Sequence, residues 1–135
     1  MKICVCIDKK NGIMLFGKRQ SQDRVQRDEM LCLVGVNKLW VSSYSSSLFE
    51  PAANVIVDDD FPKKALDEDY CFIEDVHVDL ERCSEVVLYH WNRHYPGDTF
   101  FNHNLKALGF KRVGKRDFGG SSHDKITEEI YKKVN

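Results

Sequence analysis

The stretch EVVLYHWNRHYPGDTFF, residues 85–101, decides how the chain is expected to fold. Its first seven residues form an apolar run that is rich in β-branched and aromatic side chains and bounded by charge. This composition predicts a buried strand. The segment YPGDTFF then brings Pro96 and Gly97 together, which indicates a turn that leads into a bend.

Further short apolar runs lie on both sides of this stretch. They are KICVCI (2–7), IMLF (13–16), KLWV (38–41), NVIV (54–57), YCFIED (70–75) and GFKRVGKRDF (109–118), the last typical of a surface strand. DRVQRDEMLCLV (23–34) contains no glycine or proline and is predicted to be a helix that ends near Gly35. A short helix is also compatible with SYSSSLFE (43–50). Strands that alternate with short helical stretches predict an α/β fold with helices on the faces of its sheet.

The last segment, SSHDKITEEIYKKV (121–134), has two interpretations. As a helix it has an apolar stripe that includes Ile126, Ile130 and Val134. As a strand it places Ile126 and Ile130 on one face and Thr127 and Glu129 on the other. The local pattern favours a helix, and residues 122–134 stay open between the two.

Size and composition indicate one ordinary folded domain, residues 1–135. Hydrophobic residues make up 42% and charged residues 30%, a balance typical of a folded chain. The net charge of −1 does not favour binding to nucleic acid or to a membrane surface through overall charge. A local basic patch stays open.

The five cysteines are odd in number and form no C-x-x-C pair, so reduced structural thiols in the cytoplasm are expected. The first apolar stretch, Ile3 to Ile7, is too short for a signal peptide. No stretch approaches the ~20 apolar residues of a membrane span. His90 and His94 would lie ~13 Å apart on a strand, so no metal site is expected.

Taken in order, these pieces resemble the dihydrofolate reductase family. KICVCIDKKNGI (2–13) resembles its first strand and turn, and KLWVSSYSSSLFEPAANVIVDD (38–59) its next strand, short helix and strand. YCFIED (70–75) and LERCSEVVLYHWNRHYPGDTFF (80–101) resemble its Gly-Gly strand, crossover helix and long central strand. The family's closing hairpin resembles LGFKRVGKRDF (108–118) through ITEEIYKK (126–133). The resemblance implies a single three-layer domain with a mostly parallel sheet, short helices and a C-terminal antiparallel hairpin, which makes the last segment a strand.

The chain departs from the family where the family binds the phosphates of NADPH. The resemblance implies a glycine pair whose backbone amides hold phosphate, an Arg-x-Thr turn, and polar residues at the 2′-phosphate. The corresponding residues here are Glu74 and Asp75, Ser43 and Ser45, and Asp58 and Asp59. Carboxylates oppose a phosphate dianion, and the arginine is gone. No cofactor is therefore expected.

The residues expected to transfer the proton are changed as well. The family's helix carries an acid that holds the pterin ring, and the corresponding position here falls near Gln26. Asp23 and Asp28 flank it and are the candidates to replace it. The threonine that usually partners this acid is replaced by Tyr89 or His90.

We therefore expect a small cytosolic dihydrofolate reductase-like protein that has lost NADPH-dependent reduction. It would bind a small molecule, a protein or a nucleic acid through the old cleft. On a strand, Tyr89, Trp91 and Arg93 would share one face, and His90, Asn92 and His94 the other. The expected cleft residues are Gln20, Ser21, Gln22, Asp23, Arg24, Ser42, Ser43, Tyr44, Trp91 and Asn92, and the catalytic candidates are His90, Asp23 and Asp28.

Two alternatives stay open. One is a divergent NADPH-dependent pterin reductase. The other is a metal-independent ribonuclease or RNA-processing factor that uses His90, His94 or His123 as acid and base. Nucleic acid would then contact the basic residues Lys18, Arg19, Arg24 and Arg27.

Two further patterns give no support to a hydrolase. The chain also resembles short bacterial sequences labelled ribonuclease Z, but it lacks the motif H-x-H-x-D-H of that enzyme. GGSSHDK (119–125) has the composition of a serine-hydrolase set, yet adjacent residues rarely converge in triad geometry. We therefore interpret it as a polar turn.

Overall fold

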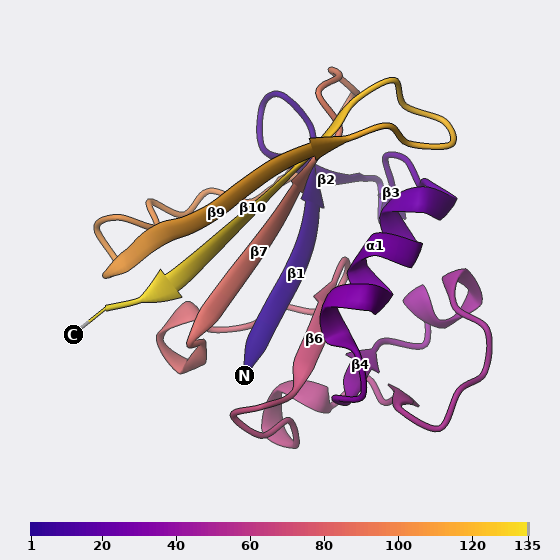
Figure 1. Ribbon diagram of the computed structural model, residues 1–135. Helices are drawn as coiled ribbons and strands as arrows, with labels where there is room; N and C mark the ends of the chain where they lie inside the picture. The colour runs from indigo at the N-terminus through magenta and orange to yellow at the C-terminus, as the bar shows by residue number, and fades with distance from the viewer. Residues whose placement is uncertain (135) are drawn as a thin grey trace.

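The computed structural model describes residues 1–134, which build a large mixed sheet and a small second sheet (Figure 1). The seven strands of the large sheet have the order β5-β4-β6-β1-β7-β10-β9. They are β1 (Lys2–Ile7), β4 (Leu39–Val41), β5 (Val55–Val57), β6 (Tyr70–Ile73), β7 (Glu85–His90), β9 (Phe110–Phe118) and β10 (Ile126–Lys133). The first five run parallel, and β9 and β10 form an antiparallel hairpin against β7. The predicted α/β class and mostly parallel sheet are confirmed.

The central strand β1 shows why this sequence forms a sheet with two covered faces. Its residues alternate, so that Ile3, Val5 and Ile7 belong to the hydrophobic core on one face and Cys4 to the core on the other. Both neighbours of β1 are parallel strands with continuous apolar runs. Such runs are typical of strands that are buried on both faces.

The helix α1 (Arg24–Val34) covers one face of the sheet, as Figure 1 shows. The Asp23 carboxylate caps its first turn by accepting a hydrogen bond from Gln26 N, and Gly35 ends it with φ = 60°. Met30 and Val34 are buried against the sheet. The predicted helix and its end at Gly35 are confirmed.

The other face is covered by short turns and loops. Within residues 1–134 its helical pieces are 3₁₀ turns, η2 (Phe61–Lys63) and η3 (Leu80–Arg82), and η3 replaces the expected crossover helix. Another 3₁₀ turn, η1 (Ser45–Leu48), follows β4. The small sheet has the order β3-β2-β8, with β2 (Gly12–Leu15), β3 (Lys18–Arg19) and β8 (Thr99–Phe100). Among the residues described, no helix is long and apolar enough to cross a membrane.

Two expectations of secondary structure are settled by tertiary pairing. Residues 126–133 form the strand β10, because they pair with both β7 and β9, and the helix favoured by local pattern is wrong. The alternation expected for residues 89–94 is also wrong, because β7 ends at His90 and Asn92 has φ = 58°. Side chains beyond His90 therefore do not form strand faces.

Candidate functional site

A bidentate ion pair between Arg19 and Glu74 lies where strand β6 ends. Arg19 Nε donates to Glu74 Oε2 at 2.9 Å, and Nη2 donates to Oε1 at 3.0 Å. The guanidinium lies over the ring of Tyr44, 4.5 Å from its centre, and the Arg19 backbone N–H donates to the Tyr44 hydroxyl at 2.7 Å. Burial alone would lower the pKa of Arg19, but Glu74 raises it. The turn at Ser43 and Ser45 carries no arginine of its own, and the guanidinium beside it comes from Arg19 in β3.

Two serine hydroxyls complete this network from the turn after β4. Ser45 Oγ donates to Glu74 Oε1 at 2.7 Å, and Ser42 Oγ donates to Asp75 Oδ1 at 2.6 Å. Both serines are buried. Both hydroxyls therefore donate to the carboxylates of Glu74 and Asp75, which are expected at the positions of the family's glycine pair, and they are not free donors for a ligand phosphate.

The aspartates after β5 have partners of their own. Asp59 accepts hydrogen bonds from the backbone N–H of Ser43, at 2.8 Å, and from its hydroxyl. Asp58 pairs with Lys64 Nζ at 2.6 Å, and Asp60 lies 3.7 Å from a neighbouring lysine. Hydrogen bonds from Lys64 and from Ser43 lower the pKa values of Asp58 and Asp59, so both are ionised. The charge of Asp58 is compensated locally, and the repulsion expected from it is correspondingly weaker.

The position expected for the family's acid is closed. Gln26 is 2% exposed, and its amide nitrogen lies 3.9 Å from the sulfur of Met30. Tyr89 is fully buried, and its hydroxyl donates to Glu128 at 2.8 Å. Of the two flanking acids, Asp28 forms an exposed pair with Arg24 on the outer side of α1.

The second flanking acid, Asp23, belongs to a buried polar centre. His123 Nδ1 donates to Asp23 Oδ2 at 3.0 Å, and Nε2 lies 3.1 Å from Ser21 Oγ and 2.9 Å from the Tyr95 hydroxyl. The imidazole stacks on Trp91 with 4.4 Å between ring centres. Burial alone would raise the pKa of Asp23, but the bond from His123 and three backbone N–H groups hold it well below its usual range.

The remaining candidates lie elsewhere. On the sheet face opposite α1, His90 bonds to Glu129, which also accepts from Arg112 at 2.9 Å. Asn92 donates to Thr127 Oγ1 at 3.0 Å. The residues expected to form one cleft are therefore divided among the Arg19–Glu74 network, the His123 centre and the surface.

The basic residues likewise do not form a single patch. Arg19 forms an ion pair with Glu74, and Arg24 forms one with Asp28. Arg27 donates a hydrogen bond to Gln22 at 3.1 Å. Lys18 is exposed at the tip of the small sheet. Among the residues described, no group of three or more His, Cys, Asp or Glu side chains is placed to hold a metal ion.

A groove of about 690 Å³ runs along the outer side of α1. One wall is formed by α1, with Arg24, Arg27 and Leu31. The segment 48–55 forms the other wall, with Phe49 and Val55. Asp28 and Glu50 line the groove as well, so its lining is mixed, with apolar side chains beside two guanidinium groups and two carboxylates. Such a lining suits a small molecule that has an apolar body and a polar or acidic group.

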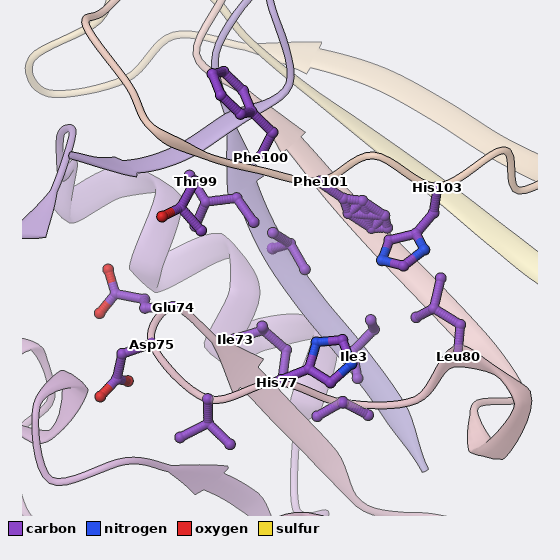
Figure 2. A pocket seen from close by; sticks show the side chains of 14 residues that line it. Ile3, Ile73, Glu74, Asp75, His77, Leu80, Thr99, Phe100, Phe101 and His103 are labelled. Atoms are coloured by element: carbon purple, nitrogen blue, oxygen red, sulfur yellow. The ribbon is translucent and has the colours of Figure 1, made fainter. Parts of the chain in front are cut away.

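A smaller cavity of about 140 Å³ lies under the loops on the opposite face (Figure 2). Figure 2 shows Phe101 and His103 from one segment facing Ile73 and His77 from another, while the Glu74 carboxylate points away from the cavity. Burial and the proximity of His77 lower the pKa of His103. The lining of this cavity is mostly apolar, and the cavity volume is close to that of a cavity that holds one benzene ring.

Comparison with known proteins supports the fold. No family model and no curated protein match the sequence. Among solved structures, the chain is similar to dihydrofolate reductase from Enterococcus faecalis in complex with NADP(H) and RAB-propyl. The two share 12% sequence identity, the match covers 99% of this chain and 96% of that one, and the TM-score is 0.69. The chain thus has a divergent dihydrofolate reductase-like fold.

Two functional features escape reasoning from the sequence. Arg19 was expected only as part of a basic cluster, and its pairing with Glu74 depends on a contact across 55 positions. His123 was expected in a polar turn and is 3% exposed. A histidine in the polar segment 119–125 gives no local signal for such burial, because its partners come from residues 21, 23 and 95.

Proposed function

We propose that this protein is a binding protein built on a dihydrofolate reductase-like fold, and that it does not use NADPH. The observation that carries the proposal is the Arg19–Glu74–Ser45 network. Glu74 and Asp75 stand at the positions of the glycine pair, and their carboxylates take up the nearby guanidinium and serine hydroxyls. These residues do not fit a dinucleotide phosphate, so we derive no reduction step.

The interior of the fold supports the same conclusion. A pterin ring held by a reductase needs an acid at an open position beside the sheet. In the resemblance that position falls at Gln26, which is a buried residue of α1 itself. Tyr89, expected at the place of the partner threonine, is also buried, and its hydroxyl donates to Glu128. A buried amide at Gln26 speaks against the pterin reductase alternative, because an amide side chain cannot serve as its acid.

Titration with NADPH tests the proposal directly. The wild-type protein is expected to give no saturation of nucleotide fluorescence up to about 100 μM, which corresponds to less than ~5.5 kcal/mol of binding free energy. The variant with Glu74→Gly and Asp75→Gly is the matched comparison, because it removes two carboxylates and frees Arg19 for a phosphate. We expect tighter binding in this variant. Saturation of the wild type below 100 μM would overturn the proposal.

We assign the binding function to the groove along α1. Arg24 is paired with Asp28, which also lines the groove, so an acidic ligand has to displace Asp28 from this exposed pair, which contributes little to stability. Benzoate and benzyl alcohol, which share a ring but differ in charge, are suitable probes. The amide chemical shifts of Leu31 and Phe49 should change when benzoate is added to the wild-type protein. The changes should be smaller with benzyl alcohol, and also smaller when benzoate is added to the Arg27→Gln variant. Shifts that are absent or independent of charge would contradict this assignment.

A further inference from the structure

The buried centre around His123 has the connectivity of a serine-hydrolase triad. Asp23 Oδ2 accepts from His123 Nδ1 at 3.0 Å, and His123 Nε2 lies 3.1 Å from Ser21 Oγ. These three residues come from two separate segments, so their convergence is a product of the fold. From this geometry we propose that Ser21, His123 and Asp23 form a site that hydrolyses small carboxylic esters.

The carboxylate fixes the tautomer that such a site requires. Asp23 is ionised and can only accept a hydrogen bond, so Nδ1 of a neutral imidazole carries the proton and Nε2 presents its lone pair. Asp23 is itself held by the backbone N–H groups of Gln26, Ser121 and Ser122, at 3.1, 3.0 and 2.8 Å. The orienting acid is therefore rigid, as a buried triad carboxylate must be.

Ser21 is the member of the trio that a substrate can reach. Its side chain is half-buried, whereas Asp23 and His123 are buried. Trp91 covers one face of the imidazole, and the edge of Tyr95 lies against it. The polar atoms within hydrogen-bond distance of Nε2 are therefore the hydroxyl oxygens of Ser21 and Tyr95. Nε2 offers one lone pair, so the Tyr95 hydroxyl has to release it before Ser21 can pass its proton, and the phenol can then donate to the oxyanion of a tetrahedral intermediate.

A mostly apolar hollow of about 360 Å³ is lined by Tyr95 and by Gln20, the residue before Ser21. Its lining also includes Leu15, Phe16 and Pro96 and the basic residues Lys18 and Arg19, whereas Ser21 itself does not line it. The hollow suits an uncharged acyl or alcohol group of a few carbons. The substrate class is therefore a small apolar ester.

The reaction balances without a cofactor. Ser21 Oγ attacks the ester carbonyl carbon, and its proton passes to His123 Nε2. The tetrahedral intermediate collapses, the bond to the alcohol oxygen breaks, and the alcohol leaves with the proton from Nε2. Water then attacks the acyl-serine, gives its proton to Nε2, and releases the acid as the proton returns to Ser21. The net reaction is ester plus water to acid plus alcohol.

Covalent labelling and turnover test this proposal, which is independent of the groove along α1. A fluorophosphonate probe is expected to form one adduct, located at Ser21 by peptide mass spectrometry. Hydrolysis of p-nitrophenyl acetate should fall at least ~100-fold in Ser21→Ala, the lower end of the range for loss of a positioned catalytic group. Ser47→Ala, an exposed serine in η1, is the matched control and should keep the wild-type rate.

Labelling of the wild-type protein tests the proposal even if the Ser21→Ala variant folds poorly, because it does not depend on that variant. Absence of a Ser21 adduct on folded wild-type protein would overturn the proposal. Equal esterase rates in folded wild-type and Ser21→Ala proteins would do the same. The trio would then be a structural contact between the start of α1 and the β9–β10 turn, which lie together in Figure 1.

Discussion

Arg19 and Glu74 lie 55 positions apart, yet their side chains meet in a two-bond ion pair that is largely shielded from water. The exposed fractions of the two side chains are 18% and 7%. The pair joins β3 of the small sheet to the end of β6 in the large sheet. It thus connects the small sheet to the large sheet at the end of β6.

Removing one partner of this pair should destabilise the fold. Arg19→Met leaves the Glu74 carboxylate covered and unpaired, and we expect a loss of about 2–4 kcal/mol in the free energy of unfolding by urea. Replacing both residues by methionine should recover most of that loss, because no uncompensated charge remains. Arg24→Met removes an exposed pair instead and should cost less than ~1 kcal/mol. Similar losses for Arg19→Met and Arg24→Met would contradict this prediction.

The turn between β9 and β10 contains two adjacent glycines, Gly119 and Gly120, and substitution by alanine should destabilise the protein at only one of them. A Cβ atom at Gly120 would lie 2.4 Å from Asp23 Oδ2 and 2.8 Å from Ile126 Cδ1. Asp23 is fixed by several hydrogen bonds, so Gly120→Ala should lower the free energy of unfolding by about 1–3 kcal/mol. At Gly119 the nearest atom is 3.7 Å away, and Gly119→Ala should be nearly neutral. Thermal melts of the two variants test this, and equal melting temperatures would show that the turn relaxes freely.

The buried Asp23 should make stability depend on pH in the acid range. Hydrogen bonds in the folded state lower its pKa below the ~3.9 of an unfolded chain. Its contribution is therefore fully present above about pH 4 and is lost as the pH falls toward the folded-state pKa. Urea denaturation at pH 7, 5 and 3 should show wild type and Asp23→Asn differing by a constant amount at the two higher values. That difference should shrink at pH 3, and a difference that grows there would have the wrong sign.

Much of the fold follows from local pattern, and the helix from Arg24 to Val34 shows why. Its cap at Asp23, its end at Gly35 and its buried stripe are all encoded within the continuous segment 23–35. The strand β10 is the opposite case. The same Ile126 and Ile130 fit a helix or a strand, and the decision comes from hydrogen bonds to β7 and β9. Only the resemblance, which carries tertiary information, favours the strand.

The candidate site is less predictable for the same physical reason. Glu74 and Asp75 are identified from the sequence as replacements of a glycine pair, yet their neutralising partners are not. A guanidinium on a long side chain can reach several carboxylates, and the sequence does not say which one it meets. His123 is harder still, because its burial depends on Trp91 and Tyr95.

The five cysteines should differ sharply in reactivity with a thiol reagent. The thiolate is the reactive form, and burial raises the pKa of Cys71 to about 12 and that of Cys83 to about 11. Burial likewise raises the pKa values of Cys4 and Cys6. Cys32 is exposed on the outer side of α1. At pH 7.5 the folded protein should therefore consume one equivalent of Ellman's reagent rapidly, Cys32→Ser should abolish that phase, and the other four thiols should react only in denaturant. A fast phase that persists in Cys32→Ser would mean that the sheet opens far more readily than its packing indicates.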